Sequence, residues 1–132
     1  MKKLAIFACV MVVGAGAAVA ATVNIPFFSD SAFQSFVGLQ NVSTSDVTLT
    51  VTYFQGASSS ASTAVLAPGA SLSWRPFDTG AGNGEIQGGV GDSPFSFGSI
   101  TIQSTGAVVG RYVQLSADGT TSSFAHNVEI TP

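Results

Sequence analysis

Apolar and polar residues alternate with a period of two along this chain, and no segment follows the 3.6-residue period of an amphipathic helix. The clearest run spans residues 47–53, where Val47, Leu49, Val51 and Tyr53 alternate with threonines. This pattern is typical of a strand with one buried and one exposed face. Threonine suits the exposed face because β-branched side chains pack well on a pleated surface. The alternation predicts an all-β fold.

Shorter alternating runs that end at turn residues predict the other strands. We expect strands over residues 23–28, 36–42, 63–66, 71–77, 96–103, 107–115 and 122–131, and loops over 43–46 and 56–62. Pro68 and Gly69 form a turn signal between two of these strands. About eight short strands at this spacing predict an antiparallel β-sandwich. The residues expected to fill its core are Leu49, Val51, Leu72, Trp74, Ile100, Ile102, Val109, Val113, Phe124 and Val128.

The first twenty residues have the three parts of a cleavable export signal. Lys2 and Lys3 precede an apolar run over residues 4–13, and the small-residue pattern Ala18-Val19-Ala20 follows. A membrane anchor would need roughly 20 apolar residues, and Cys9 stands too early for a lipoprotein. We expect a signal peptide over 1–20, with a retained N-terminal anchor as the alternative. The exported chain would be extracellular, at the cell surface or periplasmic, in a bacterial envelope.

The mature chain, residues 21–132, is predicted to be a single domain. It contains no lysine and no cysteine, and its two arginines against seven acids give a net charge of −5. No disulfide can form without a cysteine. A chain with two cations lacks the basic surface that nucleic acid or anionic lipid requires, so we expect neither nucleic acid nor, after signal cleavage, a membrane as partner.

A glycine-rich loop over residues 78–94 interrupts the strand pattern. Six of the twelve residues from 80 to 91 are glycine, and Asn83, Glu85 and Asp92 supply oxygen atoms nearby. Long loops in compact domains are functional or mobile. A calcium loop needs alternating acids, which residues 78–82 lack. We therefore favour a flexible crossover over a calcium site.

Residue types that support catalysis are scarce. His126 is the only histidine, and it alternates with Phe124 and Val128 on one apolar strand face, which is typical of a packed residue. No serine lies in a G-x-S-x-G motif. Nothing places the two glutamates, Glu85 and Glu129, side by side for glycoside cleavage. We expect no catalytic residues, no metal and no cofactor.

The two cations of the mature chain, Arg75 and Arg111, allow two interpretations. The first is a structural ion pair with Asp78 or Glu129. The second is a recognition patch, because arginine, tryptophan and tyrosine dominate the energetic centres of interfaces. The residues of that candidate patch are Trp74, Arg75, Arg111 and Tyr112.

The order of motifs across residues 33–131 resembles the β-sandwich family of the sensory rhodopsin transducer and related secreted bacterial domains. The motifs that carry the resemblance are Leu39-Gln40-Asn41, the strand 47–54, the turn 66–69, Trp74-Arg75-Pro76 and the strands 99–104 and 108–115. The resemblance implies an all-β sandwich that serves as a non-enzymatic interaction module. It carries over no functional residue.

Two functions follow from these observations. The first is a structural or protein-interaction module that self-associates through strand edges, for which the segment 22–28 is a candidate joint within or between chains. The second is a small-ligand or carbohydrate-binding module that uses aromatic side chains near the glycine-rich loop. The exposure of Trp74 discriminates between them, since a buried Trp74 is part of the core.

Overall fold

The structure is a computed structural model that describes residues 21–29, 33–77, 90–116 and 122–131, the last range without the side chains of 122–126. Its eight strands form two antiparallel four-stranded sheets, which confirms the predicted all-β fold. The strands are β1 (Ala21–Ser29), β2 (Phe33–Asn41), β3 (Val47–Gln55), β4 (Ser58–Leu66), β5 (Ser71–Trp74), β6 (Phe97–Ser104), β7 (Val108–Ser116) and β8 (Ser122–Ile130).

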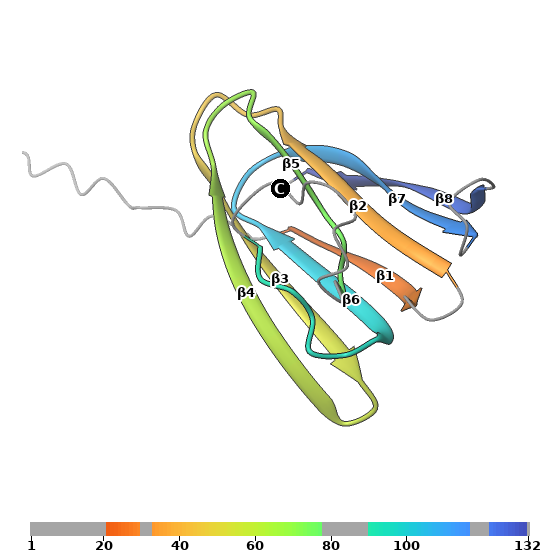
Figure 1. The fold of residues 1–132 in the computed structure, drawn as a ribbon. Coiled ribbons are helices and arrows are strands. Elements are labelled where there is room, and N and C mark those ends of the chain that lie inside the picture. The colour runs from red at the N-terminus through yellow and green to blue at the C-terminus, as the bar shows by residue number, and fades with distance from the viewer. Residues whose placement is uncertain (1–20, 30–32, 78–89, 117–121, 132) are drawn as a thin grey trace, which may run out of the picture.

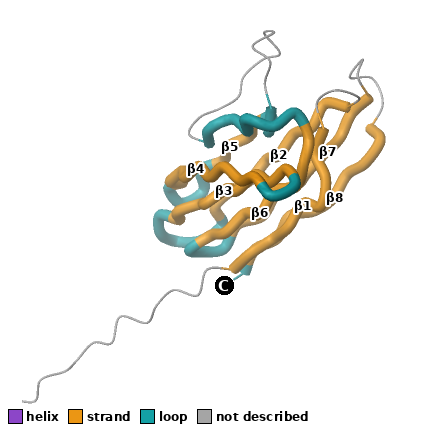
Figure 2. The backbone as a smooth tube through the Cα atoms, turned by 90° about the horizontal axis from the view of Figure 1, so that it is seen from below, coloured by secondary structure: helices purple, strands orange, loops and turns teal. Residues whose placement is uncertain are grey.

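The two sheets face each other as the layers of a sandwich (Figures 1 and 2). Sheet A has the strand order β1-β6-β3-β4, and sheet B has the order β5-β2-β7-β8. The segment 22–28 lies in β1, which pairs with β6 of the same chain. No helix in the described ranges is long and apolar enough to cross a membrane. The predicted signal peptide over 1–20 and the first part of the glycine-rich loop, 78–89, lie outside the described residues.

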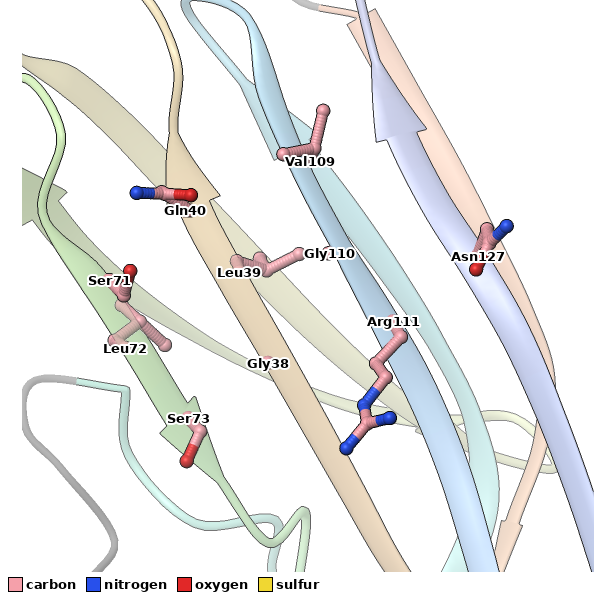
Figure 3. A pocket seen from close by; sticks show the side chains of 10 residues that line it. All are labelled: Gly38, Leu39, Gln40, Ser71, Leu72, Ser73, Val109, Gly110, Arg111 and Asn127. Atoms are coloured by element: carbon pink, nitrogen blue, oxygen red, sulfur yellow. The ribbon is translucent and has the colours of Figure 1, made fainter.

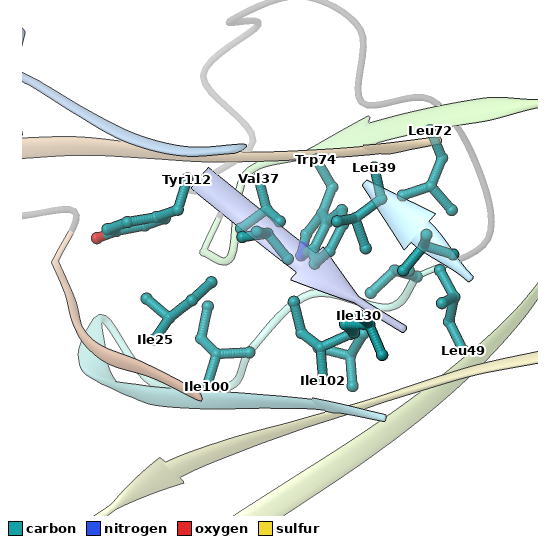
Figure 4. Packing of buried hydrophobic residues seen from close by; sticks show 14 of the residues in the cluster. Ile25, Val37, Leu39, Leu49, Leu72, Trp74, Ile100, Ile102, Tyr112 and Ile130 are labelled. Atoms are coloured by element: carbon teal, nitrogen blue, oxygen red, sulfur yellow. The ribbon is translucent and has the colours of Figure 1, made fainter. Parts of the chain in front are cut away.

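One apolar core fills the space between the sheets. Figure 4 shows Val37, Leu39 and Trp74 of sheet B pointing toward Ile100 and Ile102 of sheet A. Seven of the ten predicted core residues are buried: Leu49, Val51, Leu72, Trp74, Ile100, Ile102 and Val128. The side chain of Phe124 lies outside the described residues.

The predicted facing of β7 is wrong. Val109 is 36% exposed and Val113 is only partly buried, whereas Val108 and Tyr112 point into the core. The face that carries Val109 and Val113 also carries Arg111. Turning it inward would bury an arginine among apolar groups, which costs more than leaving two valines in contact with water. At the inward-facing position between Val108 and Tyr112, β7 has Gly110, which contributes no side chain to the core.

The loop predicted over residues 56–62 is also wrong, because β4 begins at Ser58. The turn is confined to Gly56 and Ala57, and Gly56 has a φ of 58°. Ser58 then pairs with Gln55, and the register continues to Leu66 opposite Val47. An edge strand gains backbone hydrogen bonds from its single neighbour without burying large side chains, so a serine run forms a strand here.

Candidate functional site

The predicted recognition patch does not form one surface. Trp74 and Tyr112 are each 1% exposed, and both point into the space between the sheets. The Trp74 indole N–H donates to the Tyr53 hydroxyl at 2.8 Å. The Tyr112 hydroxyl donates to the backbone carbonyl of Phe27 at 2.6 Å. Each bond joins sheet B to sheet A, so these aromatic residues connect the two layers.

Burial changes the acidity of both tyrosines. It raises the pKa of Tyr112 to about 12, although the hydrogen bonds with Ser35 and Gln114 lower it in part. The pKa of Tyr53 is also raised by burial, with the hydrogen bond from Trp74 acting in the opposite direction. Neither phenol ionises at neutral pH, so both act as neutral hydrogen-bonding groups.

The two arginines have different environments. Arg75 is 3% exposed, and its guanidinium carbon lies 5.7 Å from the centroid of the Phe36 ring, which is cation–π geometry. Its predicted partner Asp78 lies outside the described residues. Arg111 is exposed on the outer face of sheet B and forms no ion pair with Glu129. The structural tie suggested between Arg111 and Glu129 is therefore absent, and the alternative partner Asp78 lies outside the described residues.

A groove crosses the outer face of sheet B at Arg111. Its volume is about 640 Å³, and Figure 3 shows Arg111 reaching from β7 toward β2 while Ser71 and Ser73 line the far side on β5. Gln40, Val109 and Asn127 complete the set of side chains that face it. A second hollow of about 330 Å³ shares Gly38, Ser73 and Arg111 with the first and adds Phe36, Val113 and Leu115. Sequence reasoning named Arg111 as a candidate recognition residue but did not predict this groove, because only the strand register brings the residues of β2 and β5 beside Arg111.

The edge strand β4 is a second candidate surface. It occupies one rim of sheet A, and its nine residues contain no charge and no proline. Its backbone register with β3 is unbroken. Ala61, Thr63 and Val65 are exposed on the outer face, Val65 to 66%. Such an edge presents unpaired backbone donors and acceptors to another strand.

The other three edges carry features that disfavour strand addition. β1 contains Pro26 and a register shift between Ile25 and Phe28. β5 has only four residues and is followed closely by Pro76. β8 carries the charged Glu129. Proline, bulges, short length and charge are the usual protections of sheet edges, so β4 is the least protected of the four.

Three exposed phenylalanines gather at one end of the outer face of sheet A. Phe27, Phe54 and Phe97 are 47%, 36% and 50% exposed. The register places Phe54 opposite Ser99, and Phe97 lies two residues before Ser99 in β6. Phe27 lies at the irregularity of β1, where the strand pairs with the same part of β6. Grouped exposed aromatic residues are typical of interaction surfaces.

Asn41 has a structural role, although Asn41-Val42-Ser43 has the form of a glycosylation sequon. The side chain is fully buried. Its amide nitrogen donates to the carbonyls of Ser45 and Leu66 at 2.8 and 2.9 Å, and its oxygen accepts from the Ser43 backbone N–H at 2.8 Å. This amide is inaccessible in the folded chain, and it joins the ends of β2 and β4 to the loop between β2 and β3.

The described part of the chain holds no group of three histidine, cysteine, aspartate or glutamate residues that could bind a metal ion. The backbone of His126 pairs with that of Tyr112, while its side chain lies outside the described set. From the glycine-rich loop, the structure describes residues 90–94. Val90 and Ser93 are buried there, and the Gly91 N–H donates to the Ser62 hydroxyl at 2.7 Å.

No family model matches this chain, and no curated protein matches it either. The chain is similar in structure to Thermotoga maritima 1070, whose crystal structure superimposes with a TM-score of 0.56. The alignment covers 84% of this chain and 92% of that chain at 13% sequence identity. Similarity at this level shows a shared fold.

Proposed function

We propose that this chain is an exported, non-catalytic β-sandwich that acts as a structural or protein-interaction module and self-associates through β4. The observation that carries the proposal is the edge strand β4, which is nine residues long, free of charge, proline and register shifts, and paired only with β3 among the described strands. A second copy would add its own β4 in antiparallel register about a two-fold axis. This is the symmetry expected of a homodimer.

The absence of charge on β4 supports a second copy of the chain as the partner. β4 carries no ionisable group, so two copies meet there without direct charge repulsion. Pairing two edges buries less area than a standard protein interface, so we expect a weak dimer that dissociates on dilution. The exposed Phe27, Phe54 and Phe97 give the same sheet an apolar region for a further protein contact. The resemblance to the transducer family implies the same class of function.

The carbohydrate-binding alternative lacks its proposed stacking platform. It relied on Trp74, Tyr112 and phenylalanine side chains as stacking surfaces, and of these Trp74 and Tyr112 are buried in the core. Their polar atoms bond to Tyr53 and Phe27 instead of facing solvent. The burial of Trp74 therefore favours the interaction module.

Light scattering coupled to size-exclusion chromatography tests the proposal. The mature chain should show an average mass that rises with concentration toward that of a dimer. The double variant Ala61→Lys/Thr63→Lys places two charges on the β4 edge and should remain monomeric, because edge lysines prevent strand addition. A concentration-independent monomer for the unmodified chain would contradict the proposal.

The matched control is Thr48→Lys/Gln103→Lys, which adds the same charge to exposed positions of the same sheet away from its edge. It should dimerise as the unmodified chain does. Equal loss of dimer in both double variants would assign the effect to net charge and would count against β4. Thermal unfolding of all three proteins checks that the variants stay folded.

A further inference from the structure

The outer face of sheet B contains a transverse row of residues that the β4 proposal does not use. The register aligns Ser73 of β5 with Gly38 of β2, Gly38 with Arg111 of β7, and Arg111 with Asn127 of β8. Gly38 has no side chain, so the face is lowered at the centre of this row. The groove of about 640 Å³ follows from that gap between the neighbouring rows.

The rows on either side differ in chemistry. Phe36 and Val113 pair across β2 and β7 on one side and present an apolar wall. On the other side lie Gln40 and Val109, with Ser71 next to Gln40 on β5. The Gln40 amide nitrogen already donates to the Gly69 carbonyl at 3.1 Å, which fixes the side chain and leaves its oxygen as an acceptor.

Arg111 supplies the only positive charge among the described residues that line the groove. It is exposed, and its side chain makes no ion pair or hydrogen bond with any residue in the described part of the chain. Glu129, the acid on the same face, pairs with Val109 and so stands diagonal to Arg111. The guanidinium is therefore available to bind a carboxylate with two parallel hydrogen bonds.

The charges around the groove favour a ligand with a single negative charge. The mature chain has a net charge of −5, so a polyanion would be repelled overall. One cation in the groove matches one negative charge. Ser71, Ser73 and Asn127 are neutral groups that can bond to hydroxyls, and Phe36 with Val113 can pack against a carbon framework. The volume lies in the range of small-molecule sites.

We propose that this groove binds a hydroxylated monocarboxylate of the sugar-acid class. Arg111 holds the carboxylate, the serines and Asn127 bond to hydroxyls, and the apolar wall contacts the ring. The site lies on sheet B, and the β4 edge lies on sheet A. Binding and self-association are therefore separate properties of the chain.

Isothermal titration with glucuronate, supported by amide chemical-shift mapping, tests the proposal. Glucuronate should bind and shift the amides of β2, β5 and β7. Glucose, which lacks the carboxylate, and acetate, which lacks the hydroxyls, should each bind at least about tenfold more weakly. A charge-assisted hydrogen-bonded pair is typically worth that factor or more. Equal affinity for glucuronate and either comparator would overturn the proposal, as would absence of glucuronate binding or tighter binding of an acidic peptide.

Two variants locate the site. Arg111→Gln should weaken glucuronate binding by about tenfold or more, because it removes the charge and the paired donors. Gly38→Val should block the groove while keeping the fold, since the space above Gly38 is open apart from the Ser73 Cβ at 3.8 Å and valine favours strands. Unchanged affinity in either folded variant would overturn the assignment.

The matched control is Gln103→Ala on the outer face of sheet A, which should bind glucuronate as the unmodified chain does. The monomeric variant Ala61→Lys/Thr63→Lys should also bind it normally. Loss of dimer with retained binding, or the reverse, separates failure of this inference from failure of the proposed function. Loss of glucuronate binding in Gln103→Ala would place the ligand elsewhere and contradict the inference.

Discussion

The indole N–H of Trp74 and the hydroxyl of Tyr53 form a 2.8 Å hydrogen bond that joins β5 of sheet B to β3 of sheet A through the core. The Tyr53 hydroxyl in turn donates to the Gly91 carbonyl at 3.1 Å. This connection holds the described end of the glycine-rich loop against sheet A. Trp74 therefore contributes to stability by linking three parts of the chain.

Replacing Tyr53 with phenylalanine should destabilise the fold by about 1–3 kcal/mol, because it leaves the Trp74 N–H and the Gly91 carbonyl without their partner in the interior. Urea unfolding followed by far-UV circular dichroism measures the change in this variant and in those that lack Trp74. The double variant Tyr53→Phe/Trp74→Phe should cost less than the sum of the two single variants. Strict additivity would show that the hydrogen bond contributes nothing beyond packing.

Stability should fall at high pH as the buried tyrosines ionise. The pKa of Tyr112 is raised from 10.0 to about 12 in the folded chain, so the folded state holds this proton more tightly than the unfolded state does. The associated stability is fully present below pH 10 and is lost as the pH rises toward 12. Urea midpoints across this range measure the loss. The chain has only two tyrosines, so tyrosinate absorbance should rise together with unfolding. Tyrosinate absorbance that rises near pH 10 in the folded chain would contradict the burial of both phenols.

Two adjacent valines form a matched pair that tests which face of β7 is buried. Val108 is fully buried, and Val109 is 36% exposed. Val108→Ala should destabilise the fold by about 1–3 kcal/mol through lost burial and a cavity. Val109→Ala should change stability by about 0.5 kcal/mol or less. Chemical denaturation of both variants under identical conditions gives the comparison, and the reverse order would restore the facing predicted from the sequence.

Asn41 should be among the residues least tolerant of substitution. Asn41→Asp keeps the shape but replaces the donors to Ser45 and Leu66 with a buried carboxylate oxygen. The expected loss is about 2 kcal/mol or more, because two carbonyls lose their donor and a charge is buried. Thermal unfolding provides the measurement. An exposed asparagine, Asn24 in β1, is the control, and Asn24→Asp should be nearly neutral.

The sequence predicted those parts of the fold where a single pattern dominates. In β3 every second residue is apolar and the rest are threonine, apart from Phe54 and Gln55 at the end, so both the strand and its buried face were predicted correctly. In β7 both faces contain apolar residues. Two residues decide which face of β7 is buried. Arg111 stays on the exposed face, and the Tyr112 hydroxyl bonds to the opposite sheet from the buried face.

The candidate surfaces depend on pairing that a local pattern does not report. The run 58–62 has no apolar periodicity, and its strand conformation depends on β3 alongside it. Arg111 and Gly38 are distant in sequence, and only the register of β2 with β7 brings them together. Residue type suggested Trp74 and Tyr112 as recognition residues, whereas their hydrogen bonds place them in the core.

Cysteine cross-linking tests self-association through β4 most directly, because residues 21–132 contain no cysteine. Single cysteines would be introduced at the exposed positions of β4, Ser59, Ala61, Thr63 and Val65, and at Gln103 as a control on the same sheet. Residues opposite each other in paired strands bring their Cβ atoms within about 5 Å, so one or two of the β4 variants should form disulfide-linked dimers under mild oxidation. The Gln103 variant should form no disulfide-linked dimer, because Gln103 lies away from the β4 edge. Equal cross-linking at Gln103, or none at any position of β4, would contradict the account.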